Sequence, residues 1–185
     1  NFITISGDSL GGLDGVVRFL GDVDSDADDL VAGLACSAWS PTEVVVAVPT
    51  PVGPFPVGPI SLETSGGQID RTDDTNGPFL PDFEINSTVR PGLCAVTPSS
   101  AESGDAFAVT GVNLGSGGPG TEVYLDTALV TSVSDWSATG FNAVVPPTPV
   151  GEKDLTVTVG AEGSNPIAFE VASPDAGSAP VISYI

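Results

Sequence analysis

The sequence contains no histidine and no methionine, and its four basic residues stand against 24 acidic ones, for a formal net charge of −20. Without histidine and with a single lysine, no serine or cysteine can be given a neighbouring base, which argues against acyl-transfer chemistry. Binding to nucleic acid or to an anionic membrane needs clustered lysine and arginine. The sequence therefore predicts neither partner, since its basic residues are only Arg18, Arg71, Arg90 and Lys153.

Long apolar runs are also missing. None approaches the ~20 residues of a membrane-spanning helix, so no membrane insertion is predicted. No glycine-rich phosphate loop precedes a helix pattern. A pair of carboxylates, as in glycoside hydrolases, stays conceivable among the acidic residues, but it needs a cleft that short-turned sheets rarely provide. The prediction is that the chain is not an enzyme. A surface this acidic needs screening by salt or divalent cations for close assembly, which fits an extracellular or cell-surface protein.

Glycine and proline are abundant, with 23 and 17 residues, and no helical period of 3.6 runs through the chain. This composition is typical of an all-β protein with many turns. One block occurs twice, at residues 37–53 and 134–151, and holds the two tryptophans of the chain, Trp39 and Trp136. A repeat of this kind predicts two similar units, each with its tryptophan as an aromatic plug beside the proline-rich turn.

Comparison of the two copies locates their differences. Gly7 aligns with Gly111 and Trp39 with Trp136, so the first copy carries extra residues, about the length of Asp22–Asp28. Further extra residues fall in Gly66–Pro81, which we expect to be a polar loop. Insertions that are confined to turns are typical of β-sandwiches.

Several motifs of the second copy resemble the IPT/TIG immunoglobulin-like domain: residues 110–115 (TGVNLG), 136–139 (WSAT), 144–147 (VVPP), 150–159 and 164–171 (SNPIAFEV). The first copy keeps residues 6–11 (SGDSLG) and 39–42 (WSPT). The resemblance implies two tandem immunoglobulin-like β-sandwiches, at 1–90 and 91–174. It says little about activity, because the family includes ligand-binding ectodomains, DNA-binding proteins, enzyme accessory modules and surface spacers.

The two ends of the chain are out of phase with this family. Its members open with a strand that the second copy has at 91–98, but the first copy begins in the following strand. After the second copy, residues 175–185 form a linker and a spare strand with the same pattern. A sandwich without its first strand exposes unpaired backbone groups, and a strand from another copy would cover them. The predicted donor strand is Pro180, Val181, Ile182, Ser183, Tyr184 and Ile185, and the predicted acceptor is Phe2, Ile3, Thr4 and Ile5.

Head-to-tail pairing of this kind does not close on itself, so it predicts a filament subunit with structural or adhesive function. Two alternatives stay open. The chain could be a piece of a longer array of repeats, with flanking repeats as its partners. It could also be a spacer or a carbohydrate-binding accessory module of a longer secreted or surface protein, with glycans as partners.

Alternate carboxylates suggest a calcium site at Asp22, Asp24, Asp26 and Asp28. This segment lacks the glycine and the glutamate of an EF-hand, so a solvated acidic loop is the other interpretation. A second acidic cluster, Asp70, Asp73 and Asp74, has the same ambiguity. No other cofactor is predicted.

The two cysteines, Cys36 and Cys94, could form one disulfide or be two buried thiols, and without histidine a zinc site is close to excluded. A Cys36–Cys94 disulfide would join the two units. Asn86 begins the triplet Asn-Ser-Thr, which is a candidate glycosylation site.

Overall fold

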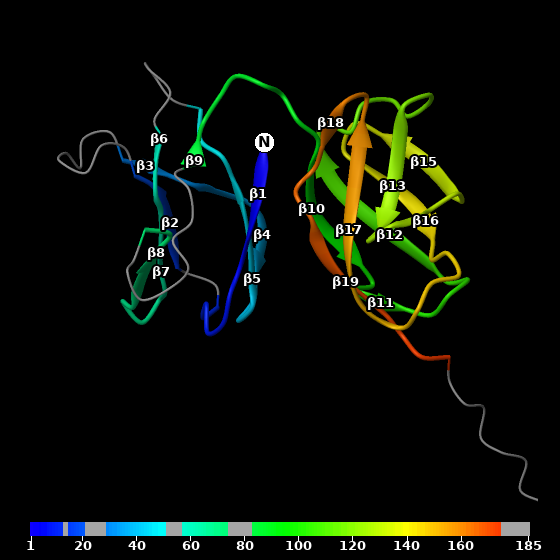
Figure 1. Cartoon of the computed structure of the whole chain (residues 1–185), viewed down its shortest axis with the longest axis horizontal. Helices are drawn as coiled ribbons and strands as arrows, with labels where there is room; N and C mark the ends of the chain where they lie inside the picture. The colour runs from blue at the N-terminus through cyan, green and yellow to red at the C-terminus, as the bar shows by residue number, and fades with distance from the viewer. Residues whose placement is uncertain (13–14, 21–28, 51–56, 74–82, 175–185) are drawn as a thin grey trace, which may run out of the picture.

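The computed structural model describes residues 1–12, 15–20, 29–50, 57–73 and 83–174. In this part of the chain all regular structure is β-strand, as the composition predicts, and the strands form two units that lie next to each other (Figure 1). The four aspartates of the possible calcium loop and the predicted donor strand at 180–185 lie outside the described residues.

The strands of the first unit are β1 (Phe2–Ser6), β2 (Val16–Phe19), β3 (Leu30–Val31), β4 (Gly33–Trp39), β5 (Glu43–Ala47), β6 (Val57–Gly58), β7 (Ile60–Glu63), β8 (Ile69–Arg71) and β9 (Phe83–Glu84). Strands β1, β5 and β4 form one sheet in that order, here called the inner sheet. Strands β3, β2, β7 and β8 form the outer sheet, and β6 pairs with β9.

The strands of the second unit are β10 (Gly92–Thr97), β11 (Ser100–Ala101), β12 (Ala106–Val112), β13 (Thr121–Leu125), β14 (Ala128–Leu129), β15 (Val133–Ser137), β16 (Gly140–Val144), β17 (Gly151–Val159), β18 (Glu162–Gly163) and β19 (Ile167–Val171). One sheet has the order β10-β12-β16-β15 and the other β11-β19-β17-β13-β14, with β18 on β17. The two sheets enclose a core that includes Leu93, Phe107, Leu155 and Phe169.

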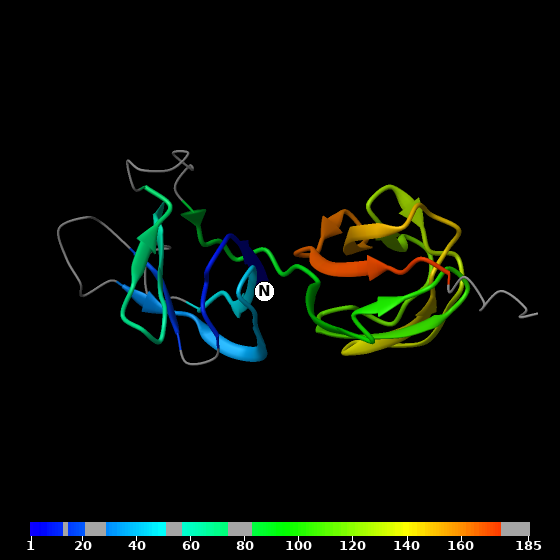
Figure 2. The same cartoon turned by 90° about the horizontal axis from the view of Figure 1, so that it is seen from below.

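Strand β5 of the inner sheet is buried on both faces. Because side chains alternate along a strand, Val44 and Val46 of β5 point into the core of the first unit. Val45, between them, is 1% exposed and belongs to the core of the second unit, together with Phe2 of β1. Figures 1 and 2 show the inner sheet on the side of the first unit that faces the second. The inner sheet therefore contributes side chains to the hydrophobic cores of both units.

The central strand pairs of the two units have the same register. In the first unit Ile3 lies opposite Val46, and in the second Phe107 lies opposite Ala143. Phe107 follows Ile3 by 104 positions, which is the offset between Gly7 and Gly111. Ala143 follows Val46 by 97 positions, which is the offset between Trp39 and Trp136. Strand β1 thus corresponds to β12, and β5 to β16.

The segment 66–81, which we expected to be a polar loop, contains a short strand, and another short strand lies within 98–105. Within 66–81, Ile69–Arg71 forms β8, because Gly67 adopts a positive φ of 76° and turns the chain back onto β7. Within 98–105, Ser100 and Ala101 form β11, which pairs in parallel with β19. Polar composition concealed both strands, since every residue of β8 is exposed.

Candidate functional site at the open edge of the first unit

Each tryptophan closes the turn that follows the first central strand of its unit. The indole Nε1 of Trp39 donates to the carbonyl oxygen of Leu10 at 2.8 Å, and that of Trp136 donates to Leu114 at 2.9 Å. The two acceptors are again related by the offset of 104. Both hydrogen bonds hold a turn in place, and both occupy the indole N–H.

The turns themselves agree in backbone detail. Gly7 N donates to Thr42 O at 3.0 Å, as Gly111 N does to Thr139 O. Ser9 and Asn113 have positive φ angles of 59° and 56°. The serine after each tryptophan repeats its contacts as well, since the hydroxyl groups of Ser40 and Ser137 accept from the backbone N–H two residues later at 3.3 Å. The repeat therefore extends to hydrogen bonding.

The units differ at the outer edge of this strand pair. In the second unit β10 pairs with β12 and covers its edge. In the first unit β1 is the last strand of the inner sheet, and within the described residues no strand covers it. The carbonyl oxygen of Asn1 accepts from Val48 N, and Gly7 N donates to Thr42 O, so both residues point their backbone groups toward β5 and its flanks. By alternation, the backbone groups of Phe2, Thr4 and Ser6 point away from β5.

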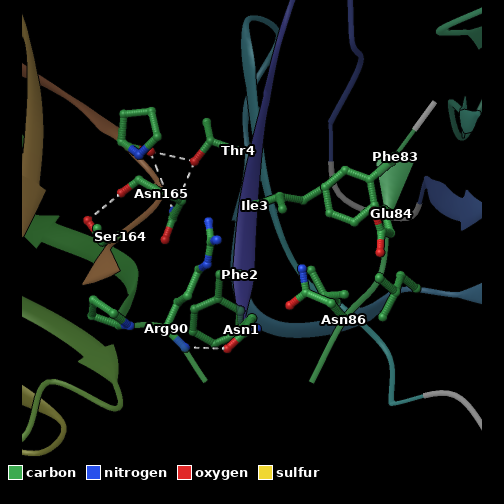
Figure 3. Close-up of a pocket in the computed structure, with 15 residues that line it drawn as sticks. Asn1, Phe2, Ile3, Thr4, Phe83, Glu84, Asn86, Arg90, Ser164 and Asn165 are labelled. Atoms are coloured by element: carbon green, nitrogen blue, oxygen red, sulfur yellow. Dashed lines mark hydrogen bonds between the residues drawn. The ribbon is translucent and has the colours of Figure 1, made fainter. Parts of the chain in front are cut away.

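A pocket of about 320 Å³ lies beside the start of β1 (Figure 3). Its walls come from β1, from the segment that leads from β9 to β10, and from the turn before β19. It is lined by Asn1, Phe2, Ile3, Thr4, Val48, Phe83, Glu84, Ile85, Asn86, Arg90, Pro91, Gly163, Ser164, Asn165 and Pro166. In Figure 3 the side chains of Ile3 and Phe83 point toward each other across its apolar side.

The apolar side of this pocket corresponds to an occupied place in the second unit. Its residues Ile3, Val48, Phe83 and Ile85 align with core residues of the second unit: Phe107, Val145, Phe169 and Val171. There, Ala101 of β11 is 8% exposed and belongs to the same core. The pocket is thus the position that β11 fills in the second unit.

The polar side of the pocket joins the two units. Asn165 is buried, and its Oδ1 accepts from Leu93 N at 2.8 Å. Its Nδ2 donates to Leu93 O and to Thr4 Oγ1, both at 3.0 Å. Thr4 Oγ1 in turn donates to the carbonyl oxygen of Pro166. The side chain of Asn1 donates to Thr88 O at 2.6 Å and accepts from Arg90 N at 2.9 Å.

Glu43 of β5 also bridges the units. Its Oε2 accepts from the backbone N–H of Ala168 in β19 at 3.1 Å. Burial raises the pKa of the Glu43 carboxyl above its ordinary value, and the negative charges of Glu152 and Asp154 raise it further, against the effect of the Ala168 hydrogen bond. The contact between the units therefore holds a carboxyl group that resists ionisation.

Of the other predicted site residues, Asn86 lines the pocket, whereas Asp70 and Asp73 do not. The side chain of Asn86 is exposed, and its Oδ1 accepts from Thr88 N at 3.0 Å. Asp73 pairs with Arg71 at 2.8 Å, and Asp70 Oδ1 accepts from Arg71 N. No group of three or more possible metal ligands occurs among the described residues.

Cys94 is disulfide-bonded. It lies in β10, which contacts β4, the strand that contains the backbone of Cys36. The structure does not describe the Cys36 side chain, so the Cys36–Cys94 pairing stays a prediction.

The large apolar side chains that are exposed in the described ranges are all aliphatic: Val31, Ile69, Val89, Leu129 and Val150. Stacking platforms for sugar rings are usually exposed aromatic side chains. No helix of the described chain is long and apolar enough to cross a membrane.

Residues 92–171 match the model of the IPT/TIG domain family, which supports an immunoglobulin-like fold for the second unit. The match confirms the family resemblance of this unit. Membership of the first unit stays a prediction, which rests on the shared register and turn. A search of curated proteins found no match.

Among solved structures, the chain is similar to the γ-CGTase from alkalophilic Bacillus clarkii, with 17% identity and a TM-score of 0.42 over 92% of this chain and 21% of the enzyme. It is also similar to SGBP-B from a xyloglucan utilization locus in Bacteroides uniformis, with 15% identity and a TM-score of 0.37 over 91% and 44%. A third is the Bacteroides ovatus SGBP-B in complex with a mixed-linkage heptasaccharide, with 12% identity and a TM-score of 0.34 over 93% and 41%. The chain spans less than half the length of each of these proteins.

Proposed function

We propose that this chain is a non-catalytic structural segment of an extracellular or cell-surface protein, in which two sandwiches are held as one stiff spacer. The observation that carries the proposal is that the inner sheet contributes side chains to both cores, since Phe2 and Val45 belong to the core of the second unit. Independent domains on a flexible linker would expose this face. Asn165, Glu43 and the Asn1 side chain add polar contacts across the same boundary.

The spacer function predicts that the two units tumble as one body. Val45→Asn puts into the shared core the residue that the second unit has at the aligned position, Asn142, which is exposed. Burial of an unpaired amide disfavours the closed interface. Small-angle scattering and NMR relaxation should show one rigid particle for the wild type and greater motion between units for Val45→Asn, with Asn142→Val as the matched control. Independent tumbling of the wild-type units would contradict the proposal.

A carbohydrate-binding accessory module is the second candidate within this class. What supports it is a pocket with an amide and a guanidinium group beside an apolar side chain, from Asn86, Arg90 and Phe83. Affinity electrophoresis in gels with xyloglucan or mixed-linkage glucan tests it directly. Retardation that Arg90→Ala abolishes would favour binding over a purely structural function, and unchanged mobility would favour the spacer.

The filament subunit predicted from the sequence is a further form of the structural function. The open edge of β1 favours it, because this edge offers unpaired backbone groups to an added strand. Electron microscopy of the purified chain at high salt or with divalent cations would reveal such fibres.

A further inference from the structure

The second unit shows how a complete edge is built. Strand β10 lies antiparallel to β12, with Val96 opposite Val109 and Thr97 opposite Ala108. Leu93, near the start of β10, has no exposed surface and belongs to the core. An added strand at this edge therefore contributes both backbone hydrogen bonds and an apolar side chain.

The first unit has the same edge at β1, and no strand covers it in the part of the chain that the structure describes. Ile5 and Thr4 align with Val109 and Ala108, and β1 has the same register against β5 that β12 has against β16. In the place of β10, residues that correspond to 91–96 would use the outward backbone groups of Ser6. The pocket beside Ile3 and Phe83 lies at the start of the same strand.

We propose that this edge accepts residues 180–185 of a second copy of the chain as an added strand. Residues 180–185 read Pro-Val-Ile-Ser-Tyr-Ile, and residues 91–96 read Pro-Gly-Leu-Cys-Ala-Val. Both have proline first and aliphatic residues third and sixth. In the register of β10, Ile185 lies opposite Ile5 and Ile182 enters the core in the place of Leu93. Tyr184 takes the place of Ala95, which is exposed.

The direction of the chain favours a second copy over the same one. Strand β1 lies where the first unit faces the second, whereas the chain leaves the second unit after β19 on the side away from the first unit (Figures 1 and 2). A strand donated from that side to the next β1 repeats head to tail and gives an open linear assembly. With a net charge of −20 on each copy, association should strengthen with salt. The inference rests on the proposed structural function but is tested separately from it.

The test compares association of four full-length variants by sedimentation velocity over a concentration series at low and high salt. Ile182→Asp places a charge in the proposed core position and should weaken association about tenfold or more. Tyr184→Asp adds the same charge at the exposed position and should leave association nearly unchanged. On the acceptor side, Ser6→Pro removes an outward N–H and should also weaken association, whereas Ser6→Ala retains it. Circular dichroism verifies that each variant is folded.

Hydrogen exchange of the peptide that contains β1 gives a second measurement, with slower exchange expected in the assembled wild type than in Ile182→Asp. A chain that stays monomeric at every concentration and salt would overturn the proposal. Association that survives both Ile182→Asp and Ser6→Pro would also overturn it, because another surface would then be responsible. Either result leaves the stiffness of the spacer, measured on monomers, unaffected.

Discussion

In the first unit Phe2 and Val45 point from the inner sheet toward the second unit and are buried there. In the second unit the aligned residues are Ala106 and Asn142, and both are exposed. The backbone register around them is the same in the two units. The same strand pairing therefore presents an apolar surface in the first unit, which packs against the second unit, and an exposed surface with a polar residue in the second unit. The interface thus depends on a few side chains and not on the fold.

The largest expected effect compares two aligned phenylalanines. Phe169 has no exposed surface and lies 5.0 Å from the Phe107 ring, whereas Phe83 is half-buried at the edge of its core, 5.3 Å from Phe19. Phe169→Ala should cost about 3–5 kcal/mol of unfolding free energy. Phe83→Ala should cost less, about 1–2 kcal/mol, because less of its surface leaves water. Urea unfolding of both variants measures the difference, and equal losses would mean that the pocket beside Phe83 is filled in solution.

Next in size is the loss of the polar junction. Asn165→Ala removes the partners of the buried Leu93 backbone groups and of Thr4, which should cost about 1–3 kcal/mol. Asn142→Ala removes an exposed amide that donates to Asp135 and should change stability by less than about 0.5 kcal/mol. Thermal melting of the two variants tests this ranking. Equal shifts would show that Asn165 does not hold the units together.

The tryptophans should give equal effects if the repeated turn is equivalent in both units. Trp39→Phe and Trp136→Phe each keep an aromatic ring but remove one indole hydrogen bond, for about 1 kcal/mol apiece. Trp136 also stacks on Phe141 at 4.4 Å, a contact that phenylalanine can retain, whereas the aligned residue in the first unit is Val44. Denaturant unfolding of each variant measures its loss of unfolding free energy. A loss in only one of the two variants would show that the two turns are not equivalent.

The smallest effect concerns pH. The raised pKa of Glu43 means that its contribution to stability is greatest below its ordinary value of 4.5 and is lost as the pH rises through the raised value. Glu43→Gln should remove this part of the pH dependence and stabilise the junction at neutral pH. Asp126 is the control with the opposite sign, since the Asp154 N–H and Lys153 lower the pKa of its carboxyl. Its contribution is lost as the pH falls, so Asp126→Asn should flatten the acid side of the melting curve. A Glu43→Gln curve that parallels the wild type would contradict this assignment.

The fold was largely predictable from the sequence because it rests on alternation and on a repeated turn. The spacing of Gly7 and Trp39 against Gly111 and Trp136 already gives the register that β1 and β12 share. The double burial of β5 was not predictable. In Val44-Val45-Val46 apolar residues follow one another without a polar face, and such a run does not say which core each side chain enters. The same limit applies to Asn165, whose importance comes from burial at a boundary between units that are far apart in the sequence.

The side chain of Asn1 has a mechanical consequence. It bonds to Thr88 and Arg90, so the start of β1 is fastened to the segment that leads into the second unit. A stretching force applied at Asn1 and at the far end of the second unit would pass through this fastening and not along residues 2–87. Residues 2–87 would then form a closed loop that does not bear the applied force. It would begin to unravel only after those two hydrogen bonds had sheared, which is a property suited to a protein that must keep its shape under load.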